Sequence, residues 1–291
     1  MPSDAAAVMS SRTLITAAEL AAALASAQPP VVLDCSFELS DPDAGHRSFL
    51  AGHLPGARCV HLDHDLAGVK TGRNGRHPLP EVADLAATVG RWGVRPGVPV
   101  VCYDIQGGPY AARAWWLLRW LGHHDVAVLD GGLAAWRAAG GAVQLGDAAA
   151  AAALPPYPLS AAFAAAMTTI DAPTLLADLA AFRIIDARAG ERFRGEVEPL
   201  DPVAGHIPGA RLRFFKDNLQ ADGRFKPPGQ LRAEFEALGL ADCRVVHQCG
   251  SGVTACHNLL AMAHAGLGDT ALYPGSWSEW CSDPARPVAR G

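Results

Sequence analysis

Short apolar runs alternate with longer amphipathic stretches along the whole chain. The runs have the length and the valine and isoleucine content of β-strands, whereas stretches such as 112–122 and 254–266 are long enough for helices. The runs are VVLD (31–34), VPVVCY (98–103), VAVLD (126–130), FRIID (182–186), CRVVHQ (243–248) and TALY (270–273). This alternation predicts an α/β fold in which parallel strands are joined by crossover helices that cover both faces of a sheet.

The chain contains an internal repeat. AGHLPGAR at 51–58 recurs as AGHIPGAR at 204–211 with a single difference, and the signals around it keep the same order. Asp34 in the first half corresponds to Asp186 in the second, and Asp104 corresponds to Cys249. The pair Gly131 and Trp136 corresponds to the pair Gly275 and Trp280. The two halves are therefore copies of one folding unit.

The length of 291 residues suits two domains that each bury a core of their own. Alanine, glycine and proline dominate the sequence between the copies, which is typical of a linker. We expect a first domain at 1–145, a linker at 146–164 and a second domain at 165–291.

Composition and charge exclude several classes of protein. The formal net charge is −5, charged residues make up 18%, and there is no basic block, so we expect no nucleic-acid partner. Glu19 interrupts the apolar N-terminal stretch, and no run reaches the roughly 20 apolar residues of a membrane span, which predicts a soluble, unexported protein. Seven scattered cysteines without a C-x-x-C pair indicate reduced thiols in the cytoplasm.

The most informative stretch is HQCGSGVTACHN at 247–258, where Cys249 follows a strand and precedes a helix. Ligands of open parallel sheets bind at the carboxyl ends of the strands. A cysteine attacks as its thiolate, and its ordinary pKa is about 8.5, so the site must stabilise an anion. Gly250 and Gly252 tolerate positive φ and close approach, so we expect the loop to curl around the sulfur with backbone N–H groups directed at it, and we expect a helix to start near Val253. No cationic side chain is required for this; the alternative is a buried structural thiol.

The loop CGSGVTA, with GHIPGA before it, GSWSEW after it and a degenerate copy in the first half, resembles the tandem-domain rhodanese superfamily, in particular its 3-mercaptopyruvate sulfurtransferase branch. The resemblance implies two rhodanese-like domains, each a mainly parallel sheet flanked by helices on both faces. It also implies that Cys249 takes a sulfane sulfur as a persulfide and passes it to a thiol, such as that of thioredoxin, or to cyanide. No metal and no organic cofactor is implied.

The resemblance assigns the remaining site residues. Arg192 matches the arginine that holds the anionic end of the donor, although Arg188 and Arg194 lie nearby. The branch often has a second arginine in the segment that reads GEVEPLDPVA here (195–204), so the choice between 3-mercaptopyruvate and thiosulfate stays open. A Ser, His and Asp set maps onto Ser251, His77 and Asp65 and suits proton transfer or polarisation of a carbonyl. Gly250, Gly252, Val253 and Thr254 are expected to line the substrate.

The first copy is expected to be inactive. Asp104 stands at the position of Cys249, and a carboxylate cannot carry sulfane sulfur. The sequence that follows it, IQGGPYAA, has a different length and contains a proline, so we expect it not to form the same nest of N–H groups.

The sequence fits three other kinds of site or function less well. A tyrosine phosphatase needs an arginine six residues after its cysteine, and Ala255 stands there. Cys249, Cys256, His257 and His264 have no recognised zinc spacing. A rhodanese-type binding module is the alternative without catalysis, and an intact Cys249 loop argues against it.

Overall fold

The computed structural model describes residues 13–147, 154–159, 167–240, 243–268 and 270–291. The chain divides into two compact units. The first comprises the described parts of 1–66, 80–166 and 221–224, and the second comprises 67–79, 167–220 and 225–291. Segment 67–79 therefore packs with the second unit, although it lies in the first half of the sequence. Much of the linker expected at 146–164 falls outside the described residues, and its bounds stay a prediction.

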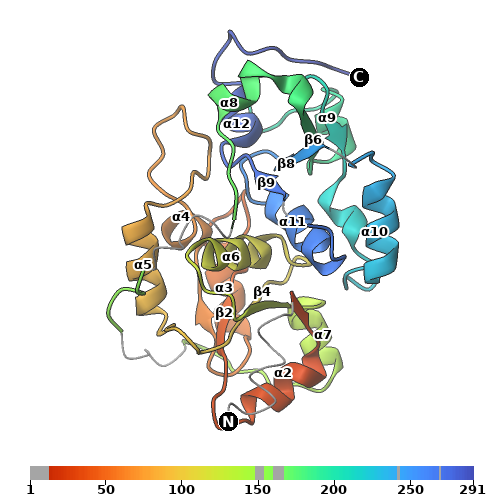
Figure 1. Ribbon diagram of the computed structural model, residues 1–291. Helices are drawn as coiled ribbons and strands as arrows, with labels where there is room; N and C mark the ends of the chain where they lie inside the picture. The colour runs from red at the N-terminus through yellow and green to blue at the C-terminus, as the bar shows by residue number, and fades with distance from the viewer. Residues whose placement is uncertain (1–12, 148–153, 160–166, 241–242, 269) are drawn as a thin grey trace. The chain divides into compact units, whose positions relative to one another are not determined.

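The first unit is built around a five-stranded parallel sheet in the order β1-β5-β4-β2-β3 (Figure 1). Strands β4 and β5 are buried along their whole length, as expected for a parallel sheet that is covered on both faces. The elements of this unit are β1 (Leu14–Ile15), α2 (Ala17–Leu24), β2 (Val31–Asp34), α3 (Ala44–Ala51), β3 (Arg58–Cys59), α4 (Leu62–Asp65), α5 (Val82–Arg91), β4 (Val100–Tyr103), α6 (Pro109–Trp120), β5 (Val126–Leu129) and α7 (Gly132–Ala138).

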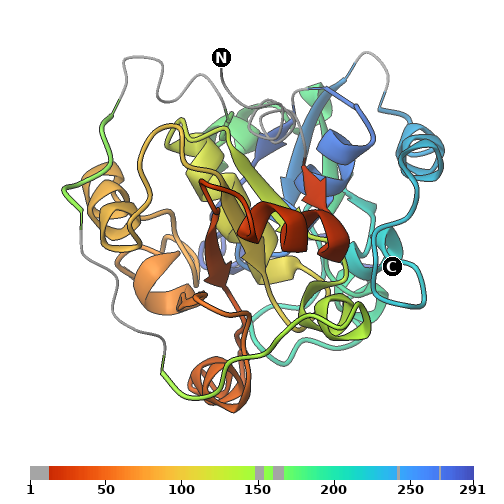
Figure 2. The same ribbon diagram turned by 90° about the horizontal axis from the view of Figure 1, so that it is seen from below.

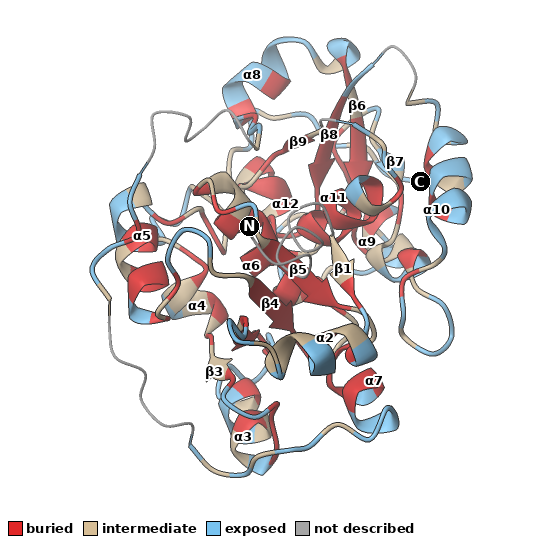
Figure 3. Ribbon diagram, turned by 60° about the horizontal axis from the view of Figure 1, so that its bottom comes forward, coloured by how far each residue is buried: buried red, intermediate tan, exposed pale blue. Residues whose placement is uncertain are grey.

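Helices cover both faces of this sheet. Helices α2, α3 and α7 bring Leu20, Phe49 and Trp136 into one core with Val101 and Leu129 of the strands; Figure 2 has α2 in the foreground. Helix α6 contacts β4 and β5 and is buried over most of its length. In Figure 3 β4 and β5 are red, whereas α2 and α5 carry pale blue residues, which is the pattern of amphipathic helices around a buried sheet.

The second unit repeats this plan with a four-stranded parallel sheet in the order β7-β6-β8-β9. Val246 of β8 packs in one core with Leu175 of α8 and Trp277 of α12, whereas α11 contacts β8 and α10. The elements of this unit are α8 (Ala172–Ala177), η1 (Leu179–Ala181), β6 (Phe182–Asp186), α9 (Gly190–Phe193), β7 (Arg211–Leu212), η2 (Phe215–Asn218), α10 (Pro228–Glu236), β8 (Arg244–Gln248), α11 (Ala255–His264), β9 (Ala271–Leu272) and α12 (Ser276–Trp280). The α/β fold predicted for each half is confirmed.

The repeated GHxPGA motif has the same local structure in both units. His53 stacks on Phe49 with 3.7 Å between ring centroids, and its Nδ1 lies 2.8 Å from the Phe49 carbonyl oxygen. His206 stacks on Phe193 at 3.9 Å and makes the corresponding 2.8 Å contact with the Phe193 carbonyl. This motif is therefore a structural element of the fold in both copies.

Three features of the described residues bear on the chemistry of the protein. Across the described ranges no helix is long and apolar enough to cross a membrane, and no three His, Cys, Asp or Glu side chains gather in a way that could hold a metal ion. All seven cysteines are free thiols.

Candidate active site

Cys249 stands immediately after β8, and its side chain is buried. Its backbone N–H donates to Ser276 Oγ at 3.1 Å, and its carbonyl accepts from the N–H of Trp277 at 3.0 Å. The N–H of Ser251 lies 3.4 Å from the Cys249 Sγ. The thiol is thus fixed at the carboxyl end of the sheet with a backbone donor directed at its sulfur.

The two loop glycines are required for different reasons. Gly252 has φ +78°, and a Cβ there would also lie 2.3 Å from the carbonyl oxygen of Pro274. Gly250 does not adopt positive φ, and of the two properties expected of these glycines it uses close approach. It is required for space, because a Cβ at this position would lie 2.7 Å from Nη2 of Arg76.

The helix after the loop begins later than expected. Helix α11 starts at Ala255, and Thr254 caps it without a side-chain hydrogen bond. The carbonyls of Val253 and Thr254 accept the N–H groups of Cys256 and His257 at 3.0 and 3.1 Å. Val253 and Thr254 therefore form the turn that joins the loop to the helix, and their contact with substrate stays a prediction.

Ser251 and His77 lie together. Nδ1 of His77 is 2.7 Å from Oγ of Ser251, and both side chains are buried. Segment 67–79 is held in the second unit partly by the N–H of Arg76, which donates to Ser278 Oγ at 3.0 Å. The hydroxyl and the imidazole are therefore within hydrogen-bonding distance of each other, and their part in proton transfer stays a prediction.

Asp65 belongs to the first unit, where it ends the short helix α4. Its Oδ2 accepts the N–H of His61 at 2.8 Å, and burial raises the pKa of its carboxyl. Its membership of a set with Ser251 and His77 stays a prediction.

The three arginines of DARAGERFRG have three different environments. Arg188 is buried against Asp186, with Nη2 2.6 Å from Oδ2. Burial lowers the pKa of Arg188, but the charges of Asp186, Glu198 and Cys249 outweigh that effect and raise it. Arg194 pairs with Glu196 on the surface. Only Arg192 combines partial exposure with a place beside the Cys249 loop, since its Nη1 is 3.4 Å from where a Cβ of Gly250 would stand.

Sequence reasoning missed Arg76. Its guanidinium forms an ion pair with Asp201 and lies beside Gly250, although 125 residues separate Arg76 from Asp201 along the chain. The only signal was its position next to His77 in GRHPLP. Two guanidinium groups, those of Arg76 and Arg192, therefore lie beside Gly250.

The matching loop of the first unit does form a nest. Oδ1 of Asp104 accepts N–H groups from Gln106 at 2.9 Å and Gly108 at 2.8 Å, and Oδ2 accepts from Tyr110 and Ala111, both at 3.0 Å. Burial raises the pKa of this carboxyl, and the four N–H bonds oppose that shift. From its different length and its proline we expected this loop not to form the same nest as the Cys249 loop. It does form a nest of its own, because Pro109 takes the first turn of α6, where no N–H is needed.

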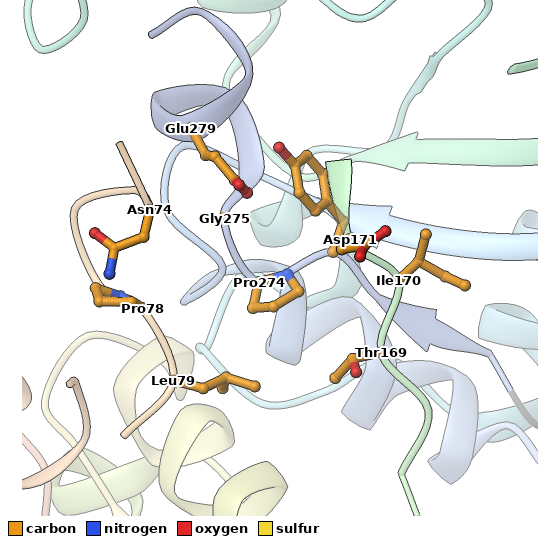
Figure 4. Close-up of a pocket in the computed structure, with 10 residues that line it drawn as sticks. Asn74, Pro78, Leu79, Thr169, Ile170, Asp171, Pro274, Gly275 and Glu279 are labelled. Atoms are coloured by element: carbon orange, nitrogen blue, oxygen red, sulfur yellow. The ribbon is translucent and has the colours of Figure 1, made fainter. Parts of the chain in front are cut away.

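A pocket of about 230 Å³ is lined on one side by residues of segment 67–79. Figure 4 shows Asn74, Pro78 and Leu79 on one side of it and Thr169 to Asp171 on the other, with Pro274 to Glu279 between them. Gly75 packs closely here, since a Cβ would lie 2.6 Å from the carbonyl oxygen of Gly275. Cys249 is not among the lining residues, so this pocket is a feature of how the segment packs and not the site of reaction.

The chain matches the family model described as Rhodanese-like domain twice, over residues 16–139 and 171–283. The folds, the two copies and the strand-end cysteine loop agree with that match. The chain belongs to the rhodanese family.

Relatives match along nearly the whole length. A Pseudomonas aeruginosa protein named as a probable 3-mercaptopyruvate sulfurtransferase is 53% identical over 97% of this chain and 100% of its own. A Mycobacterium tuberculosis protein, provisionally named thiosulfate sulfurtransferase SseB, is 45% identical over 96% of this chain and 98% of its own. The solved structure of 3-mercaptopyruvate sulfurtransferase from Leishmania major is 31% identical, with a TM-score of 0.81 over 93% of this chain and 74% of that one.

Proposed function

We propose that this protein transfers a sulfane sulfur from 3-mercaptopyruvate to a thiol or to cyanide through a persulfide on Cys249. The observation that carries the proposal is the buried Cys249 thiol after β8, with the Ser251 N–H 3.4 Å from its sulfur and two arginines beside the next residue. Whole-length relatives with sulfurtransferase names support it.

The first half-reaction forms the persulfide. The Cys249 thiolate attacks the sulfur of 3-mercaptopyruvate, an S–S bond forms, and the bond between carbon 3 and sulfur breaks. The electron pair of the broken bond goes to the carbon as the enolate of pyruvate, which takes up one proton to give pyruvate. The donor sulfur stays on Cys249, so no external oxidant or reductant is needed.

The second half-reaction releases the sulfur. A thiolate or cyanide attacks the outer sulfur of the persulfide, and Cys249 leaves as a thiolate that the Ser251 N–H stabilises. Cyanide gives thiocyanate, and a thiol gives a new persulfide. A protein dithiol of the thioredoxin kind suits this step, because a second thiol can then release the sulfur as sulfide.

Ser251 and His77 assist the departure of pyruvate. The carbonyl oxygen of 3-mercaptopyruvate gains negative charge as the enolate forms, and a hydroxyl beside Cys249 can donate a hydrogen bond to it. His77, 2.7 Å from that hydroxyl, orients it and exchanges a proton with it. Arg192 binds the carboxylate of the donor.

Thiosulfate is the alternative donor, and the name of the Mycobacterium tuberculosis relative favours it. The neutral residues Gly250 and Ser251 favour 3-mercaptopyruvate, because they add no positive charge for a dianion. We expect kcat/KM to be about tenfold or more higher for 3-mercaptopyruvate, which corresponds to roughly 1.4 kcal/mol. Kinetics with both donors and cyanide test this; a higher kcat/KM for thiosulfate would reassign the donor.

We also propose that the protein works in a reducing compartment, the cytoplasm. Its seven free cysteines support this, since exported proteins usually pair their cysteines in disulfides.

We further propose that the chain divides into domains at 1–145 and 165–291. The internal repeat supports this division.

Mass spectrometry of the intact protein tests the mechanism directly. Incubation with 3-mercaptopyruvate without an acceptor should add one sulfur atom, about 32 Da, to the chain, and cyanide should remove it. A binding module without catalytic activity would gain no sulfur.

A further inference from the structure

The start of helix α12 is bound to the Cys249 loop. The N–H of Trp277 donates to the Cys249 carbonyl at 3.0 Å, and the N–H of Ser278 donates to the Gly250 carbonyl at 2.9 Å. Oγ of Ser276 accepts the N–H of Cys249 at 3.1 Å. The first residues of this helix therefore fix the peptide groups on both sides of the nucleophile.

Ser278 also holds segment 67–79, through its side chain. Its Oγ accepts the N–H of Arg76 at 3.0 Å, and its hydroxyl donates to the Gly275 carbonyl at 3.3 Å. A hydroxyl has one hydrogen and can accept as well, so both bonds form at the same time. A single residue thus joins the nucleophile loop to the segment that carries His77.

The packing around this contact is close. Gly75 has φ +84°, and a Cβ on it would lie 2.6 Å from the carbonyl oxygen of Gly275. The segment approaches the start of α12 at van der Waals distance because it has no side chain at this point. A shift of the Arg76 peptide would therefore carry over to His77, the next residue.

The position of His77 decides its contact with Ser251. Nδ1 of His77 lies 2.7 Å from Oγ of Ser251, which is two residues after Cys249. Hydrogen bonds of this kind extend to about 3.2 Å, so a displacement of about 1 Å breaks the contact. The guanidinium of Arg76 differs, because it has an ion pair of its own with Asp201. Loosening of this segment is therefore expected to affect the imidazole before the guanidinium.

We propose that Ser278 is a positioning residue, whose hydroxyl sets the place of His77 against Ser251. This inference rests on the proposed function, in which His77 and Ser251 assist the departure of pyruvate. The step that depends on Ser278 is therefore cleavage of the bond between carbon 3 and sulfur of 3-mercaptopyruvate. Release of sulfur to the acceptor does not depend on it.

Steady-state kinetics of Ser278→Ala with two sulfur donors tests the proposal. The variant loses the acceptor for the Arg76 N–H and keeps its own backbone bond to Gly250. We expect kcat with 3-mercaptopyruvate to fall about tenfold and KM to stay within about twofold, because the imidazole is misplaced while the binding groups remain. With thiosulfate kcat should also stay within about twofold, since sulfite leaves without forming an enolate.

Two further variants separate positioning from a general loss of structure. Ser278→Thr keeps a hydroxyl and should retain most of kcat with 3-mercaptopyruvate. Ser282→Ala is the matched control. This serine follows α12 and donates to the Glu279 carbonyl at 2.8 Å, so its loss should leave kcat with both donors unchanged.

A double-mutant cycle shows whether Ser278 acts through His77. In a His77→Ala background, Ser278→Ala should cause no further fall in kcat with 3-mercaptopyruvate, because the imidazole that Ser278 positions is already absent. If the two residues acted independently, the losses would multiply.

Four outcomes would overturn this role: an unchanged kcat in Ser278→Ala, equal losses with the two donors, a loss in Ser278→Thr as large as in Ser278→Ala, or multiplied losses in the double variant. The proposed function fails separately, if wild-type protein gains no sulfur from 3-mercaptopyruvate in the mass-spectrometric test.

Discussion

His77 Nδ1 lies 2.7 Å from Ser251 Oγ, although 174 residues separate the two along the chain. The contact exists because segment 67–79 leaves the unit formed by its sequence neighbours and packs with the second unit. Side chains from the first half of the sequence thus belong to the second unit and lie beside the Cys249 loop.

Ser251→Ala and His77→Asn should each lower kcat with 3-mercaptopyruvate by about a hundredfold, the usual contribution of a general acid. With thiosulfate the same variants should lose far less, because sulfite leaves without forming an enolate. Steady-state kinetics with the two donors measure the difference. Equal losses with both donors would indicate a purely structural pair.

Cys249→Ser should abolish sulfur transfer to every acceptor and leave the fold intact, because a hydroxyl does not form a persulfide. Cys256→Ser is the control: this buried thiol donates to the Gly252 carbonyl at 3.3 Å, and a hydroxyl can keep that bond. Transfer assays and circular dichroism check both variants. Turnover by Cys249→Ser would refute the mechanism.

Asp104→Cys should take up no second sulfur. The reason is the shape of the loop, since its four N–H groups contact the two oxygens of a carboxylate and are not arranged around a single sulfur. Mass spectrometry after donor treatment should therefore find one added sulfur per chain. Two sulfurs would show that the nest alone is sufficient for reactivity.

Glu234 should make the second unit sensitive to acid. Burial alone would raise its pKa, but hydrogen bonds from Lys226, Arg213 and Gln230 outweigh burial and lower the pKa to about 2. Because the folded-state pKa lies below the ordinary value of 4.5, the contribution of Glu234 is complete above pH 4.5 and is lost as pH falls toward 2.

The test is Glu234→Gln, which should lower the free energy of unfolding by about 1 kcal/mol at pH 7, after allowance for solvent screening. Denaturant unfolding at several pH values should show the difference from wild type shrinking below pH 4.5. A difference that stays constant down to pH 3 would argue against the ion pairs. Arg232→Gln, which affects a surface pair with Glu236, is a control expected to change stability little.

Much of this molecule follows from local sequence. Apolar runs such as 126–129 and 182–186 are strands because continuous burial of short β-branched segments is what a covered parallel sheet requires. The repeat predicted two α/β units, and the position of Cys249 between a strand and a helix marked the candidate reactive loop. These features depend on residues within a few positions of one another, so spacing alone reveals them.

The composition of the site depends on the tertiary structure. Arg76 and Asp201 are 125 residues apart, and no pattern in either segment says that they meet beside Gly250. The nest around Asp104 was missed for a related reason, since loop length and a proline do not fix where each N–H points. Sequence sets local conformation through short-range sterics and hydrogen bonds, whereas the partners of a charged side chain are set by which distant segments pack together.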